Sequence, residues 1–185
     1  MRVDQAGVYA RAGAAPAILA LLAFAMPTIA SSHSASDAYL TLTADGSMPD
    51  GRLVIHGQWD IALRDLDFVL GLDDDGDGKV TWGEVRTHRA AIEGYAYRNL
   101  KLVGGDGKVC SIDPQRELID DHADGAYAAL FFDAACAHGA QRLALGYTLF
   151  FEIDPSHRGI VVMHSGTAVA TALLSPQHAR IDLRP

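Results

Sequence analysis

The pattern of apolar and polar residues predicts strands over most of the chain. Residues 37–43 (DAYLTLT) and 52–59 alternate in polarity, which is typical of strands with one buried face. After Leu100, short apolar runs separated by Gly, Asp and Pro turn signals predict further strands. These runs cover residues 100–103, 108–112, 117–122, 126–135, 142–153, 159–164 and 168–174. Short strands at this spacing are typical of an antiparallel sandwich or barrel.

Residues 60–99 have a different, helical spacing. Asp60 is expected to cap a first helix, and a second helix fits residues 82–99. The apolar positions that share a face are Ala62, Leu66, Val69 and Leu70 in the first helix, and Val85, Ile92, Tyr95 and Ala96 in the second. We therefore predict an α+β, mainly β fold: an antiparallel β-sandwich or barrel-like domain with an inserted helix-loop-helix.

The N-terminus has the order of segments found in a secretory signal peptide. A basic stretch with Arg2 and Arg11 precedes the apolar run 14–26, and small residues follow it. The run is shorter than the roughly 20 residues that cross a bilayer. We expect a signal peptide over residues 1–30, with cleavage after Ala30 or, nearly as well, after Ser32. One β-rich domain over residues 36–176 and a C-terminal tail over 177–185 would follow, with no transmembrane helix and a periplasmic or secreted location.

The segment between the two helices carries a metal-binding motif. Residues 73–84 (DDDGDGKVTWGE) match the EF-hand pattern D-x-[DN]-x-[DN]-G-x5-E at every defined position. Such a loop surrounds Ca²⁺ with oxygen ligands, and Gly78 permits its sharp turn. The expected ligands are the side chains of Asp73, Asp75, Asp77 and Glu84, the Lys79 carbonyl, and Thr81 directly or through water.

An acidic surface turn that binds nothing is the alternative, because Asp and Gly are also common turn residues. The match at every ligand position favours calcium. A single EF-hand outside the cytosol is expected to act as a structural clamp rather than as a sensor.

Two cysteines acquire a meaning from the predicted export. In an oxidising compartment Cys110 and Cys136 are expected to form a disulfide, although two unpaired buried thiols remain an alternative. The turn signal at residues 123–125 predicts a hairpin that brings Cys136 opposite Ile112. A bulge near Pro114 would then shift Cys110 into place.

Charge and the remaining motifs exclude several function classes. The formal net charge is −8, which disfavours binding to nucleic acid. The sequence contains none of the nucleophile-elbow, zinc-protease or phosphate-loop motifs, so we expect no enzyme. The histidines after residue 100 lack metal-ligand spacing and are expected in turns or on the surface. They are His122, His138, His157, His164 and His178.

Several stretches resemble the N-terminal extracytoplasmic region of HupE/UreJ-type bacterial membrane proteins, which are hydrogenase or urease accessory proteins. They are SDAYLTL from Ser36, WDIALRDLD from Trp59, WGE from Trp82, YTLFFEIDPSHRGI from Tyr147 and TALLSP from Thr171. The resemblance implies a periplasmic accessory domain with a periplasmic or membrane protein as partner. The role in nickel or cobalt passage proposed for that family belongs to membrane helices outside these stretches, so only the loop ligands carry over.

Three functions remain open at this point. The first is a calcium-binding exported accessory or binding domain, with calcium as a clamp. The second is a secreted hydrolase with an unrecognised site, which would need a cleft lined by histidine and carboxylate side chains. The third is a calcium-responsive signalling subunit, which would expose an apolar groove when calcium binds.

Overall fold

The structure, a computed structural model, describes residues 36–47, 52–137 and 142–184. The predicted signal peptide and His138 lie outside these residues. The described chain forms nine strands and two helices. They are β1 (Asp37–Ser47), β2 (Leu53–Ala62), α1 (Leu63–Leu70), α2 (Trp82–Arg98), β3 (Leu100–Val103), β4 (Ser111–His122), β5 (Gly125–Cys136), β6 (Leu143–Tyr147), β7 (Arg158–Ser165), β8 (Ala168–Leu174) and β9 (Arg180–Leu183).

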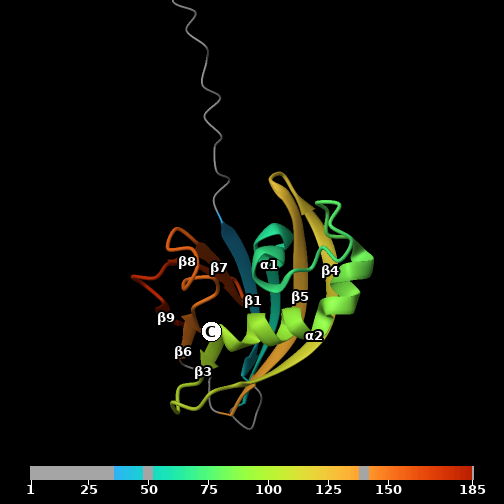
Figure 1. Cartoon of the computed structure of the whole chain (residues 1–185). Helices are drawn as coiled ribbons and strands as arrows, with labels where there is room; N and C mark the ends of the chain where they lie inside the picture. Colours follow the sequence, from blue (N-terminus) through green and yellow to red (C-terminus); the bar gives the residue numbers. More distant parts are fainter. Residues whose placement is uncertain (1–35, 48–51, 138–141, 185) are drawn as a thin grey trace, which may run out of the picture. The chain divides into compact units, whose positions relative to one another are not determined.

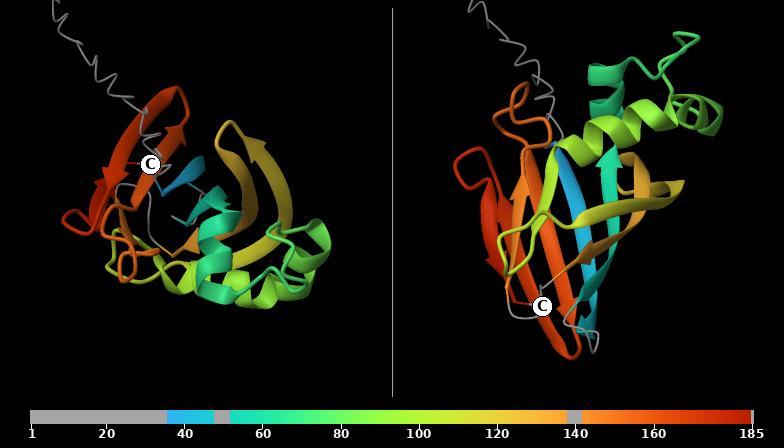
Figure 2. Two further views of the ribbon diagram at one scale, coloured as in Figure 1. Left: turned by 45° about the horizontal axis from the view of Figure 1, so that its top comes forward. Right: turned by 90° about the horizontal axis from the view of Figure 1, so that it is seen from below.

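The strands form two sheets. A six-stranded sheet has the order β4-β5-β2-β1-β7-β8, and a three-stranded sheet has the order β3-β6-β9 (Figure 1). Neighbouring strands are antiparallel except for β1 and β7, which are parallel. The larger sheet curves strongly in the two further views (Figure 2). The α+β, mainly β fold class is confirmed.

A single apolar core joins both sheets to helix α2. The predicted face of α2 is confirmed, because Val85, Ile92, Tyr95 and Ala96 are all buried. They pack with residues of the six-stranded sheet such as Trp59, which is fully buried, and with residues of the three-stranded sheet. Helix α2 contacts β4 and β3 and lies across one face of the larger sheet (Figure 1). In the strands, the polar residues that alternate with these apolar residues therefore point away from the core.

Three local predictions differ from the structure. Strand β2 continues to Ala62, so Asp60 lies in a strand and does not cap a helix; Ala62 precedes α1 without a side-chain cap. Pairing with β1 on one side and β5 on the other extends β2 past the point where helical spacing begins. The predicted strand 142–153 ends at Tyr147, and turns follow, with Phe150 at φ 58°. The expected C-terminal tail contains β9, which pairs with β6.

The predicted hairpin and disulfide are both present. Strands β4 and β5 pair around the turn, but their register differs from the expected one: Ile112 lies opposite Ala134 and not opposite Cys136. The turn takes only residues 123 and 124, so that His122 pairs directly with Gly125. The register shifts between Pro114 and Arg116, where the bulge was expected. Cys110 and Cys136 form a disulfide, and both residues are buried. The bond fixes the open end of the hairpin opposite its turn.

No helix within the described residues is long and apolar enough to cross a membrane.

Candidate metal centres

The loop between α1 and α2 begins at a well-defined helix end. Helix α1 stops at Leu70, and Gly71 takes a left-handed conformation with φ 64°, which is typical of a helix C-terminus. The Asp67 carboxylate then accepts hydrogen bonds from the N–H groups of Leu72 (2.6 Å) and Asp73 (3.0 Å). These contacts fix the direction in which the chain enters the acidic loop.

Backbone N–H groups hold the first acidic residue of the loop. Asp73 accepts hydrogen bonds from the backbone N–H groups of Gly76 (2.8 Å), Asp77 (3.2 Å) and Gly78 (2.8 Å). Gly76 and Gly78 have φ values of 72° and 82°, a left-handed conformation that glycine adopts at little cost. The predicted turn at Gly78 is therefore present, and the loop wraps around the Asp73 carboxylate.

The last acidic residue closes the loop onto its start. Glu84 and Thr81 form a capping box at the N-terminus of α2, in which Glu84 accepts from the backbone N–H and the hydroxyl of Thr81 (2.7 and 2.8 Å). Its other oxygen accepts from the N–H of Asp74 at 2.9 Å. Glu84 is only 9% exposed. Hydrogen bonds to Thr81 and Asp74 lower the pKa of the Glu84 carboxyl, which keeps it charged.

Three of the predicted ligand side chains converge. One carboxylate oxygen each from Asp73, Asp75 and Glu84 lies within 4.8 Å of the others. The backbone N–H of Asp77 lowers the pKa of Asp75, but the charge of Asp77, desolvation and the charge of Glu84 outweigh it, so that pKa lies above its ordinary value. Asp77 is not part of the converging group, and it accepts a hydrogen bond from the N–H of Lys79 at 2.8 Å.

The donor set of the loop fits a hard cation. Its converging atoms are carboxylate oxygens, which Ca²⁺ prefers, whereas zinc and copper sites use nitrogen or sulfur. Five carboxylates against one lysine give residues 73–84 a charge of −4. This repulsion opposes closure of the loop unless a cation offsets it.

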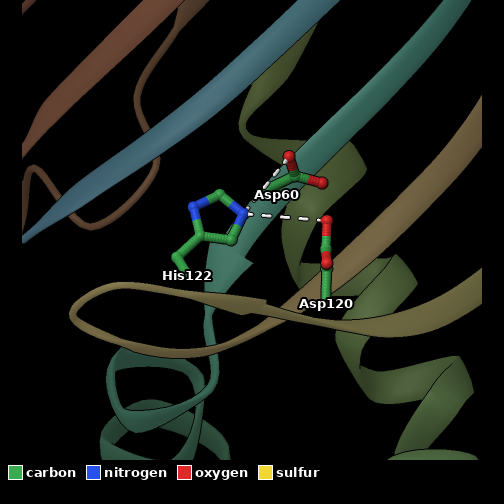
Figure 3. Close-up of side chains that lie close together, drawn as sticks. All are labelled: Asp60, Asp120 and His122. Carbon is green, nitrogen blue, oxygen red and sulfur yellow. Dashed lines mark ion pairs between the residues drawn. The ribbon is translucent and has the colours of Figure 1, made fainter.

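A second group of potential ligands lies on the larger sheet. Asp60 of β2 and Asp120 and His122 of β4 point toward one another (Figure 3). His122 Nε2 lies 3.7 Å from Asp60 Oδ2 and 3.9 Å from Asp120 Oδ2. One atom from each residue lies within 4.8 Å of the others. Sequence reasoning missed this group, because it assigned Asp60 to a helix cap and His122 to a turn or the surface.

Neighbouring side chains hold the second group in place. The amide of Gln58 donates to both carboxylate oxygens of Asp60, at 2.9 and 3.2 Å. The His122 ring stacks on Tyr127 with centroids 4.1 Å apart and planes 21° apart. Burial raises the pKa of Asp60, although Gln58 and His122 partly offset this effect. The i, i+2 spacing of Asp120 and His122 on a strand was the one sequence signal that placed two of the three on one face.

His157 corrects the expectation that the later histidines lie in turns or on the surface. It is fully buried, and burial lowers its pKa to about 4, so the ring is neutral at neutral pH. Its Nδ1 lies 2.7 Å from the Ser36 hydroxyl, and its Nε2 lies 2.7 Å from the Tyr147 hydroxyl. Ser36 donates to Asp65 at 2.8 Å, so its oxygen accepts from Nδ1–H while Tyr147 donates to Nε2.

This hydrogen-bonded chain is not arranged for nucleophilic catalysis. In a catalytic triad the serine hydroxyl donates to histidine, whereas here Ser36 donates to a carboxylate and accepts from His157. Ser36 is also only 8% exposed. This series of hydrogen bonds joins the start of β1 to the segment before β7, and it explains why a histidine can be buried there.

A comparison with known protein families and with curated proteins gives no match.

Proposed function

We propose that the protein is an exported accessory or binding domain whose 73–84 loop binds Ca²⁺, and that the ion acts mainly as a structural clamp. The observation that carries this proposal is the convergence of the ligand side chains at loop positions 1, 3 and 12, which are Asp73, Asp75 and Glu84. Helices α1 and α2 flank the loop, as an EF-hand requires. Calcium would join the end of α1 to the start of α2.

The clamp is supported by what the loop connects. Val80 packs against the core, and Glu84 is followed directly by the buried Val85 of α2. A cation that draws Asp73 and Glu84 together therefore restrains both the loop and the helix that covers the sheet. Sites of extracellular modules bind with dissociation constants of about 10⁻⁴–10⁻³ M. At calcium concentrations about 100-fold above such a constant, binding would stabilise the fold by about 2.7 kcal/mol.

Export is supported by the disulfide. Cys110 and Cys136 are joined, and structural disulfides are typical of the periplasm and the extracellular space. The resemblance to the exported region of HupE/UreJ-type proteins agrees with an accessory role and with a periplasmic or membrane protein as partner. Within this proposal calcium maintains the shape of the domain, and the partner binds elsewhere on it.

Tryptophan fluorescence offers a local test of calcium binding. Trp82 is 40% exposed at the start of α2, whereas Trp59 is fully buried in the core. Calcium that orders the loop should change the emission of Trp82, and a Trp82→Phe variant should lose this change. Calorimetry on the same protein gives the stoichiometry, with one calcium ion expected per chain.

Matched variants distinguish an effect on the loop ligands from a general effect on helix α2. Glu84→Gln removes the negative charge of the bidentate ligand and one of its two oxygens, and it should weaken calcium binding by about tenfold or more. Glu93→Gln makes the same chemical change on α2, where Glu93 pairs with Arg89, and should bind calcium normally. Equal calcium affinities for Glu84→Gln and the unmodified protein would rule out the proposed ligand set.

A sensor role has one observation in its favour. Phe68 of α1 is 79% exposed, and Trp82 lies on the other side of the loop, so two exposed aromatic side chains flank the proposed site. A sensor would increase its apolar surface when calcium binds, whereas a clamp would not. Binding of a dye for apolar surfaces, measured with calcium and with chelator, distinguishes the two.

A further inference from the structure

Beyond the calcium loop, we propose that Asp60, Asp120 and His122 form a second metal site that takes a divalent transition metal of the zinc type. The three residues come from β2 and β4, on either side of β5 (Figure 3). Their side chains lie on the face of the sheet that points away from the core, because the neighbouring Trp59 and Ile61 of β2 belong to the core. This site shares no residue with the loop and does not depend on it.

The distances within the group fit ligands of a common ion better than a direct ion pair. His122 Nε2 lies 3.7 and 3.9 Å from the two carboxylates, which is longer than a hydrogen bond. Two ligand atoms of a tetrahedral zinc ion lie about 3.4 Å apart, given bonds of about 2.0–2.2 Å. The side chain of Asp120 is 57% exposed, so it can move toward this spacing when an ion binds.

A second histidine on the same face shows how a simple ion pair looks in this sheet. His56 Nδ1 and Asp133 Oδ1 lie 2.6 Å apart, and His56 belongs to the same strand and the same alternating set as Asp60. That pair is closed by a direct hydrogen bond. His122 instead faces two carboxylates at nearly equal distances, with no hydrogen bond to either. A histidine and a carboxylate on this sheet face can therefore form a direct hydrogen bond, and the longer distances around His122 are a feature of this cluster.

The ligand types select the class of metal. One imidazole nitrogen and two carboxylate oxygens form a mixed set that suits zinc and related transition metals. Calcium requires six to eight oxygen ligands, and this cluster provides too few carboxylates. Three protein ligands also leave one coordination position open, and the 57% exposed side chain of Asp120 places that position at the surface.

The cluster is ordered before any metal arrives. Gln58 holds the Asp60 carboxylate through two hydrogen bonds, in the manner of the outer-shell groups that orient metal ligands. Tyr127 holds the ring plane of His122 by stacking. The ladder between β4, β5 and β2 fixes the spacing, because Asp120 pairs with Tyr127 and Asp60 pairs with Ala129. Ligands on paired strands are positioned more accurately than ligands on loops.

The test is a zinc titration by calorimetry with the purified protein in about 10 mM calcium, which saturates a weak calcium loop. We expect one zinc ion per chain. Asp120→Asn, at the most exposed of the three ligands, should lower the zinc affinity at least about tenfold without affecting folding, and His122→Gln should lower it further. His56→Gln and Asp133→Asn are matched controls on the same sheet face, and both should bind zinc as the unmodified protein does.

Three outcomes would overturn the proposal. The first is a dissociation constant for zinc above about 100 μM, which is an affinity too weak for a built site. The second is an equal loss of affinity in the His56→Gln control, which would indicate adventitious binding to surface histidines. The third is an unchanged affinity in Asp120→Asn and His122→Gln, with folding checked by circular dichroism. Glu84→Gln should still bind zinc, so failure of the calcium proposal is distinguishable from failure of this one.

Discussion

The proposed calcium loop and the proposed cross-strand metal cluster are built in opposite ways. The ligands of the loop lie within 12 consecutive residues, and its own backbone N–H groups position Asp73, while Glu84 is held by Thr81 and Asp74. Asp60 and His122 are far apart in the sequence, and only the register of β2, β5 and β4 brings them together. Chemistry encoded locally can therefore be read from the chain, whereas chemistry that depends on sheet order cannot.

The largest expected effect comes from the constraint on the hairpin that carries His122. Replacing both cysteines, Cys110→Ala with Cys136→Ala, removes a bond that closes a separation of 26 residues. In the chain-entropy model the free energy of unfolding should fall by about 3.5 kcal/mol, measured by urea denaturation. Amide hydrogen exchange should accelerate most in β4 and β5 and least in α1 and the loop. Equal acceleration in both regions would show that they unfold as one unit and would contradict the proposed difference between them.

Next in size is the effect of acid on the hydrogen-bonded chain around His157. The folded-state pKa of about 4 lies below the ordinary value of 6.5, so the unfolded chain takes up a proton first as the pH falls. Stability should therefore be complete above pH 6.5 and decline by about 3 kcal/mol as the pH falls to 4. Denaturation curves at several pH values measure this slope. His157→Leu should be less stable overall but should lose the slope between these values; a retained slope would assign it to other groups.

The hairpin illustrates what could be predicted from the sequence. A turn signal at residues 123–125 and alternating polarity on both sides predict that β4 and β5 form a hairpin, and these signals are local. The exact register was not predictable, because the turn takes two residues where three were expected. The disulfide and the bulge near Pro114 were predicted from this hairpin, and both are present. The buried face of α2 was predictable for the same reason, because helical periodicity is visible within the segment.

Asp60 and β9 illustrate what could not be predicted. Helical spacing begins close to Asp60, but pairing with β1 and β5 on both sides keeps the backbone extended to Ala62. Strand β9 is short and rich in charged residues, and its extended form depends on docking against β6. His157 was misassigned because nothing near it in the sequence indicates that Ser36 and Tyr147 would satisfy both ring nitrogens. Each error concerns a partner distant in the sequence.

A smaller effect is expected from a carboxylate on the core side of β4, the strand that carries Asp120. Glu117 is 5% exposed, and neither carboxylate oxygen has a hydrogen-bond partner within the described chain. Burial raises its pKa from 4.5 to about 7; from α2, Arg89 partly offsets this effect and Glu93 adds to it.

The sign of the pH effect at Glu117 is opposite to that at His157. As the pH rises above 4.5 the unfolded chain ionises first, so stability is complete below pH 4.5 and declines up to pH 7. Glu117→Gln removes the charge and should stabilise the protein by about 2 kcal/mol at pH 8, with little change at pH 4.5. Denaturation at the two pH values measures the difference. A gain of the same size at both would mean that ionisation of Glu117 is not its cause.

The smallest effect concerns a single glycine of the loop and returns to the initial comparison. Gly78 has φ 82°, and a Cβ atom built there meets no atom within 4 Å, so Gly78→Ala adds backbone strain without a steric clash. A left-handed conformation costs an ordinary residue about 1 kcal/mol, which should lower the calcium affinity about fivefold because the open loop can relax. Gly94→Ala, inside α2, is the matched control and should leave calcium binding unchanged. Zinc affinity should be unaffected by either variant, because the cross-strand cluster depends on sheet register and not on the loop; a parallel loss of both metals in Gly78→Ala would contradict their independence.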